Sequence, residues 1–65
     1  MSAPTDVIAG FAVGERVVIR FLLPDGMATD ALGEVTALDV ATCTVLTKRG
    51  EVPVPIAAAI AAKRV

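Results

Sequence analysis

The chain has 65 residues and a formal net charge of −1, and 55% of its residues are hydrophobic although only 3% are aromatic. A chain this short forms at most one domain with a small core, so part of its apolar surface stays exposed and available to a partner. Its charge balance lacks the basic excess that tight, nonspecific nucleic-acid binding requires, which argues against that function.

The N-terminal segment, residues 1–13, mixes small residues with Pro4 and Gly10 and shows no sustained hydrophobic period. We expect it to form a lead-in that is partly ordered where Phe11 packs on the folded domain. The pattern sharpens from Gly14, and we expect residues 14–65 to make up that domain.

The first strand is predicted over Arg16–Phe21, which is rich in β-branched residues. The inward residues of this strand are Val17, Ile19 and Phe21, and its outward residues are Arg16, Val18 and Arg20. Leu22-Leu23 continue the strand as far as Pro24-Asp25-Gly26, whose residue types favour a turn. A loop is expected over Met27–Asp30.

The second strand is predicted over Ala31–Asp39. Gly33 and Val35 share its inward face, but Leu38 is out of phase with them. A bulge or sharp bend near Thr36-Ala37 would return Leu38 to the core, as small barrels require where a strand turns a corner.

The third and fourth strands are predicted over Cys43–Thr47 and Glu51–Pro55, joined by a hairpin at Lys48-Arg49-Gly50. Pro53 lacks an N–H group, so we expect its side of the fourth strand to lie at an edge of the sheet or to face solvent.

The run Pro55–Ile60 is too short for a full helix and predicts a single 3-10 or α turn. A last short strand is predicted over Ala61–Val65. The sequence therefore predicts an all-β fold, a small barrel of five short strands with a 3-10 or helical turn before the last strand.

Side chains suited to catalysis are scarce. The sequence has no histidine, so it lacks a proton shuttle near neutral pH and an imidazole metal ligand. Cys43 has no histidine to activate it and falls on the inward face of its strand. Asp25 and Asp30 flank the first loop, where paired carboxylates can bind a cation or transfer protons, but a turn-forming Asp25 and a solvated Asp30 are the favoured interpretation. We expect no catalytic residue, no metal site and no cofactor-binding residue in this chain.

Neither a membrane span nor a secretion signal is expected. The longest uncharged run, Val52–Ala62, is well short of the roughly 20 apolar residues that cross a membrane. Asp6 interrupts the N-terminus before an apolar stretch can form. The single cysteine cannot form an internal disulfide, and we expect the chain to reside in the reducing cytoplasm.

Two sets of surface residues are candidates for contact with a partner. The apolar candidates for an interaction surface are Val18, Leu22, Leu46, Ile56 and Ile60. The candidates for a basic patch are Arg16, Arg20, Lys63 and Arg64. If the first and last strands pair, Arg16, Arg20 and one of Lys63 or Arg64 share a face that attracts a phosphate or an acidic surface. The alternative, which we favour, is a solvated outer face that discourages edge-to-edge association.

Several stretches between Gly14 and Val65 resemble one known module. They are Val13–Phe21, Leu23–Gly26, Thr29–Val35, Arg49–Pro55 and Ala61–Val65. Together they resemble the SH3-like domain at the N-terminus of actinobacterial GNAT-family acetyltransferases, which are described as candidate histone acetyltransferases. The resemblance implies that this chain is an SH3-like barrel. In the family, the acetyl-CoA site belongs to a separate GNAT domain that follows the barrel, so no catalytic residue carries over to this chain.

The resemblance predicts a non-catalytic accessory domain that docks on a GNAT catalytic domain in the same polypeptide or on a second copy of itself, and a homo-oligomeric assembly is compatible with this. The runner-up is a small nucleic-acid-binding barrel of the SH3-like or Sm-like kind, which the net charge and the missing aromatic residues argue against. Binding of polyproline or methyl-lysine is not expected, because the chain has neither Tyr nor Trp.

Overall fold

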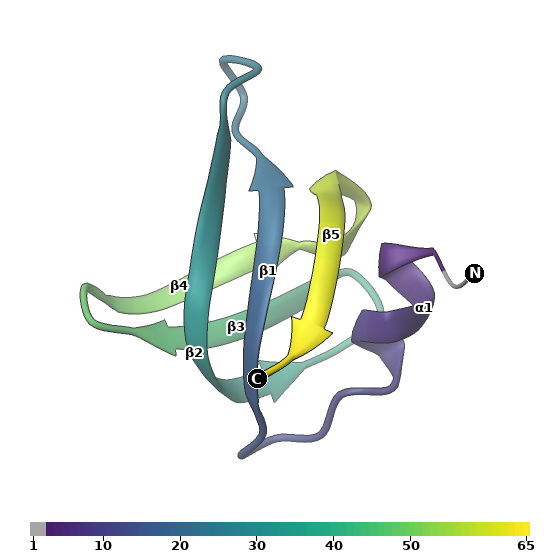
Figure 1. Cartoon of the computed structure of the whole chain (residues 1–65), viewed down its shortest axis with the longest axis vertical. Coiled ribbons are helices and arrows are strands. Elements are labelled where there is room, and N and C mark those ends of the chain that lie inside the picture. The colour runs from purple at the N-terminus through teal and green to yellow at the C-terminus, as the bar shows by residue number, and fades with distance from the viewer. Residues whose placement is uncertain (1–2) are drawn as a thin grey trace.

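The computed structural model describes residues 3–65 and confirms the all-β fold (Figure 1). The elements in chain order are α1 (Pro4–Ala9), β1 (Arg16–Leu22), β2 (Ala28–Leu38), β3 (Thr42–Thr47), β4 (Gly50–Pro55), the 3-10 turn η1 (Ile56–Ala58) and β5 (Ala59–Arg64). The strands form one five-stranded sheet in the order β4-β3-β2-β1-β5, and every neighbouring pair is antiparallel.

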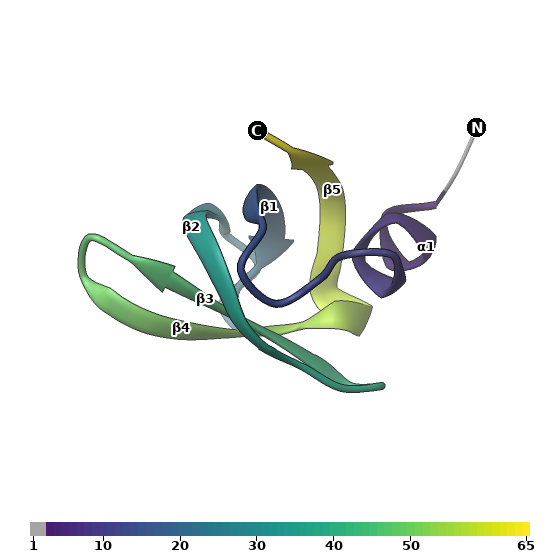
Figure 2. The ribbon, with the colours of Figure 1, turned by 90° about the horizontal axis from the view of Figure 1, so that it is seen from below.

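The long strand β2 is the corner of the fold. Its first part pairs with β1 from Ala28 to Glu34, and its last part pairs with β3 from Glu34 to Leu38. The predicted bulge is confirmed, because the β2–β3 register shifts between Val35 and Ala37 and Leu38 packs against the core. As a result, the β3–β4 hairpin crosses β1, β2 and β5 steeply, as Figures 1 and 2 show.

Gly33 makes this crossing possible. A Cβ atom at Gly33 would lie 1.9 Å from the carbonyl oxygen of Leu46, well inside contact distance. Only a residue without a side chain lets the backbones of β2 and β3 approach so closely.

The core lies between the two halves of the bent sheet and is entirely aliphatic and aromatic apart from one thiol. Its buried residues are Ile8, Phe11, Val17, Ile19, Phe21, Ala31, Val35, Cys43, Val45, Val54 and Ile56. The alternation predicted for β1 is confirmed, since the three inward residues are buried.

Strand β2 begins at Ala28, so the loop expected over Met27–Asp30 is wrong. The turn is tighter than expected, because Leu23 N–H donates to Met27 O over 2.7 Å and Asp25 Oδ1 accepts from Met27 N–H over 2.9 Å. Gly26 has φ 86°, which a side chain rarely adopts. The other residues of the expected loop, Ala28 to Asp30, therefore pair with β1.

The 3-10 turn before the last strand is confirmed, but β5 begins at Ala59, two positions earlier than expected. Pairing of Ala59 with Phe21 of β1 overrides the helix propensity of the alanines. The register shifts between Arg20 and Phe21, which leaves Ile60 in a bulge.

Helix α1 was not anticipated from the sequence. Pro4 lies in the first helical turn and Gly10 at the C-cap, and the helix packs against β5. Ile8 is fully buried and Phe11 is almost fully buried, so the core takes in side chains from the segment expected as a lead-in. The packing expected for Phe11 is confirmed. The first two residues of that segment, 1–2, lie outside the described residues.

The two outer edges of the sheet are protected. As predicted, Pro53 lies in an edge strand, β4, and Pro55 ends the same strand. At the other edge, Figures 1 and 2 show α1 beside β5. The prolines at one edge and the helix at the other both hinder pairing with a strand of another chain. Among residues 3–65, no helix has the length and apolar character needed to cross a membrane.

Candidate functional site

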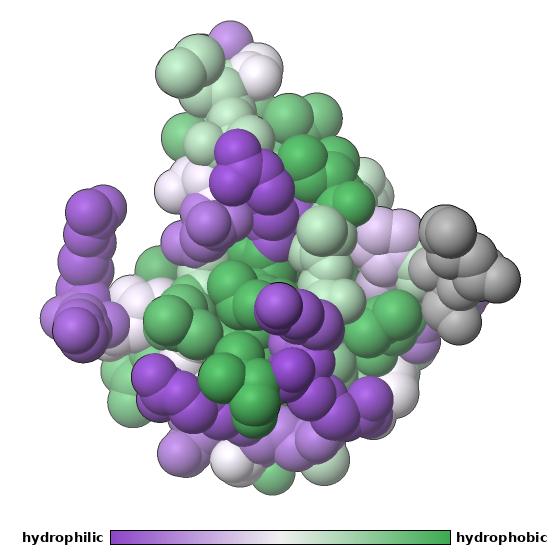
Figure 3. All heavy atoms as spheres, in the orientation of Figure 1, coloured by the Kyte–Doolittle hydropathy of each residue, from purple (hydrophilic) through white to green (hydrophobic). Residues whose placement is uncertain are grey.

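The outer surface of β1 and its two neighbours forms the broadest candidate surface, which we call the β1 face. Its residues on β1 are Arg16, Val18, Arg20 and Leu22, those on β2 are Ala28, Asp30, Leu32 and Glu34, and those on β5 are Ala61 and Lys63. Antiparallel register places Val18 between Leu32 and Lys63, and Arg20 between Asp30 and Ala61. Figure 3 shows apolar atoms in the middle of this face with hydrophilic side chains around them.

The structure brings together only part of the predicted apolar set. Val18 is half-buried and Leu22 exposed, and both lie on the β1 face. Ile60 is exposed at the bulge of β5, close to the end of that face. Leu46 is exposed on β3, opposite Glu34, and lines a groove that adjoins the β1 face.

Ile56 does not belong to an exposed surface. Its side chain is 9% exposed and is part of the core, because η1 turns it inward. The N–H of Ile56 donates to the carbonyl of Ala41 over 3.0 Å, which fixes the turn against the start of β3.

Leu32 is an apolar residue of the β1 face that the sequence analysis missed. It is 45% exposed and lies directly opposite Val18. The sequence did hold a signal for it, because its neighbour Gly33 was predicted to face inward and a strand directs alternate residues to opposite faces.

The basic residues divide between two places. Strands β1 and β5 pair, so Arg16, Arg20 and Lys63 share the β1 face. Arg64 lies opposite Val17 and turns away from that face toward Glu15. Arg20 forms an ion pair with Asp30 at 3.2 Å, with both side chains 52% exposed. An ion pair this exposed contributes less than about 1 kcal/mol to the stability of the fold. Because it brings a cation and an anion together, the β1 face carries mixed charge.

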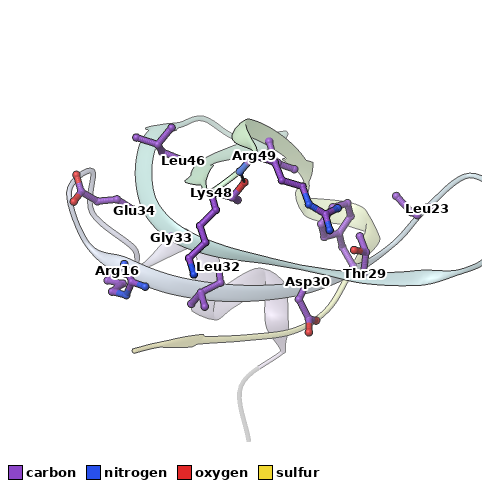
Figure 4. Close-up of a pocket in the computed structure, with 13 residues that line it drawn as sticks. Arg16, Leu23, Thr29, Asp30, Leu32, Gly33, Glu34, Leu46, Lys48 and Arg49 are labelled. Atoms are coloured by element: carbon purple, nitrogen blue, oxygen red, sulfur yellow. Dashed lines mark hydrogen bonds between the residues drawn. The ribbon is translucent and has the colours of Figure 1, made fainter.

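A groove opens between the first half of β2 and the β3–β4 hairpin, with a volume of about 970 Å³. Its lining residues are Arg16, Phe21, Leu23, Thr29, Asp30, Leu32, Gly33, Glu34, Leu46, Thr47, Lys48, Arg49 and Val52. In Figure 4, the side chains of Lys48 and Arg49 reach from the hairpin toward β2, near Leu32 and Thr29. Neither the groove nor its boundary at Gly33 was anticipated from the sequence.

The candidate catalytic groups are held in structural roles. Asp25 accepts a hydrogen bond inside its own turn, and Asp30 pairs with Arg20, so the two carboxylates do not form a joint site. Cys43 is fully buried, and burial raises the pKa of its thiol. Within the described range 3–65, no cluster of three or more potential metal ligands is found.

A sharply bent five-stranded antiparallel sheet with a 3-10 turn before its last strand defines a small barrel of the SH3-like or Sm-like class. Within this class, residues 11–63 match the family model of the Rv0428c N-terminal Sm-like domain. That match covers most of the chain, and the chain belongs to this family. Searches of curated proteins and of solved structures found no significant match.

Proposed function

We propose that this chain is a non-catalytic domain that docks through its β1 face on the catalytic domain of a GNAT-family acetyltransferase in the same polypeptide. The observation that carries the proposal is the apolar pair of half-buried Val18 and exposed Leu32 at the centre of a face rimmed by charged residues. An apolar centre with a polar rim is the usual organisation of a protein–protein interface.

The family name supports the arrangement in one polypeptide, because it describes an N-terminal domain of a longer protein. The N–H of Val65 donates to the carbonyl of Arg16 over 2.9 Å, at the rim of the β1 face. A domain joined after Val65 would therefore begin next to this face. Such a connection raises the effective concentration of the partner to about the millimolar range and so strengthens docking beyond the affinity of the separate domains.

The non-catalytic role is supported by the chemistry of the chain. It has no histidine, and its one thiol is buried. Acetyl-CoA would be bound by the attached catalytic domain and not by this one. The apolar centre and mixed charge of the β1 face suit a protein partner better than a nucleic acid, which needs a basic surface and stacking aromatic residues.

The proposal is tested by titrating the chain with the catalytic domain of a GNAT-family acetyltransferase whose own N-terminal Sm-like domain of this family has been removed. Isothermal titration calorimetry is expected to show association, and Leu22→Asp is expected to weaken it at least about tenfold by placing a charge in the apolar interface. The matched control is Val40→Asp, since Val40 is fully exposed in the β2–β3 loop outside the β1 face.

Three outcomes overturn the proposal. One is the absence of association, and another is an equal effect of the Leu22 and Val40 variants. The third is a dimer of the chain alone, detected by light scattering and broken by Leu22→Asp, which would make a second copy the occupant of the face.

A further inference from the structure

The edge of β2 facing the groove is unpaired between Ala28 and Leu32. Val35 N–H donates to Glu15 O over 2.9 Å, and Leu23 N–H donates to Met27 O over 2.7 Å, so the odd-numbered residues of this stretch bond toward β1. In an antiparallel ladder, alternate residues direct their peptide groups to opposite sides. The peptide groups of Ala28, Asp30 and Leu32 therefore point away from β1, and pairing with β3 starts only at Glu34.

This open edge contrasts with the two outer edges of the sheet. Prolines lie in one of these, β4, and α1 lies beside the other, β5. The stretch from Ala28 to Leu32 contains no proline and no segment of residues 3–65 pairs with its free side. Pairing with another strand is hindered at the two outer edges but not at this edge of β2. The groove can therefore accept one added strand.

The walls of the groove specify the chemistry of its occupant. Apolar side chains of Leu32, Leu46 and Val52 line it beside three cations, which are Arg16, Lys48 and Arg49. Of the two carboxylates on the same walls, Asp30 is already paired with Arg20 outside the groove. The cations therefore exceed the free carboxylate, Glu34.

We propose that the groove binds an extended peptide segment of alternating acidic and aliphatic residues, which adds as a strand to the free edge of β2. The exposed peptide groups of Asp30 and Leu32 hydrogen-bond to its backbone, and alternate side chains contact the apolar wall and the cations. The groove shares Arg16, Asp30, Leu32 and Glu34 with the β1 face. The hairpin cations Lys48 and Arg49 and the free backbone edge of β2 are not part of the docking proposed above, so the inference stands without it. Single-stranded RNA is disfavoured, since the one aromatic lining residue, Phe21, is buried and unable to stack on a base.

The test uses the isotope-labelled chain and a blocked hexapeptide of alternating glutamate and valine, followed by NMR. Amide signals of Asp30, Leu32 and Lys48 are expected to shift at peptide concentrations up to about 5 mM, with slower exchange of the first two amides. The same peptide with N-methyl groups on alternate amides keeps its charge but cannot extend the ladder, and it is expected not to bind.

Charge-reversal variants test whether the hairpin cations contact the peptide. Reversing the two hairpin cations in Lys48→Glu plus Arg49→Glu is expected to weaken binding at least about fivefold, whereas Lys63→Glu, on the β1 face, is expected to leave it unchanged. The inference is overturned if no shifts occur, if the N-methylated peptide binds equally well, or if an oligouridine displaces the peptide from the same amides. Shifts confined to Val18 and Leu22 would also overturn it and would leave the docking proposal intact.

Discussion

Arg64, at the end of β5, holds Glu15 across 49 positions of the chain, with Nε donating to Oε2 over 2.7 Å. The same guanidinium donates from Nη2 to the carbonyl of Gly10 over 2.7 Å, and its Cζ lies 5.3 Å from the centre of the Phe11 ring. One side chain thus ties the segment after α1 to the last strand. This explains why Arg64 is not part of the basic residues on the β1 face.

Replacing Arg64 with Ala is expected to loosen α1 selectively. The variant loses the hydrogen bonds to Glu15 and Gly10 and the cation–π contact to Phe11 together. Exchange of the α1 amides after Pro4 is expected to accelerate several-fold, while exchange in β1 and β2 changes little. The control is Lys63→Ala, one residue earlier on the same strand, and equal acceleration in both variants would show that the tie has no effect.

Acid is expected to destabilise the fold through two carboxylates. The N–H of Ala12 and the guanidinium of Arg64 lower the pKa of Glu15 below its ordinary value of 4.5. The N–H groups of Ala41 and Thr42 lower the pKa of Asp39 below 3.8. A carboxyl group with a lowered pKa in the folded state stabilises it above the unfolded-state pKa, and this contribution disappears as the pH falls through the folded-state pKa.

The midpoint of thermal unfolding is therefore expected to fall progressively below about pH 4.5. Combining Glu15→Gln with Asp39→Asn removes both titrations and keeps groups that accept hydrogen bonds, so this variant is expected to show a flatter profile. Calorimetry between pH 7 and pH 3 measures the difference, and superimposable profiles would refute this origin of the acid sensitivity.

Truncating Ile8 is expected to show that α1 belongs to the folded unit. Its side chain is completely buried, and removing a buried isoleucine side chain down to alanine costs about 3 kcal/mol. In a domain of this size that loss lowers the midpoint of thermal unfolding by more than about 10 °C. Val13→Ala is the control, since Val13 is 65% exposed, and its effect is expected to stay below about 0.5 kcal/mol.

A single methyl group at Gly33 is expected to disrupt the corner of the sheet. Its Cβ would lie 1.9 Å from the carbonyl oxygen of Leu46, and neither backbone can move without breaking the strand pairing. Gly33→Ala is therefore expected to cost at least about 3 kcal/mol in urea unfolding. At Gly10 the nearest atom to a new Cβ is 3.5 Å away, so Gly10→Ala is expected to fold normally. Equal stability of the two variants would contradict the close crossing of β2 and β3.

The sequence predicted those features that depend on local alternation. Ile19 and its inward neighbours defined β1, the phase of Leu38 predicted the bulge, and Pro53 predicted an edge strand. Helix α1 escaped prediction because its six residues include a single fully buried side chain, Ile8, and only packing on β5 stabilises so short a helix.

The surfaces were less predictable, because they depend on contacts between distant strands. The alternation at Leu32 indicated an outward side chain, but its position opposite Val18 required the β1–β2 register. The groove exists because β2 and β3 diverge on the Leu32 side of Gly33, and the tie between Glu15 and Arg64 joins residues 49 positions apart in the chain. No local pattern contains either relationship.

Mapping amide shifts on the labelled chain during addition of the proposed partner, a GNAT-family catalytic domain, tests docking through the β1 face most directly. We expect the largest shifts at Val18, Leu22 and Leu32, with Val40 unaffected. No shifts under saturating conditions, or shifts confined to the β3–β4 hairpin at Lys48-Arg49, would contradict the account.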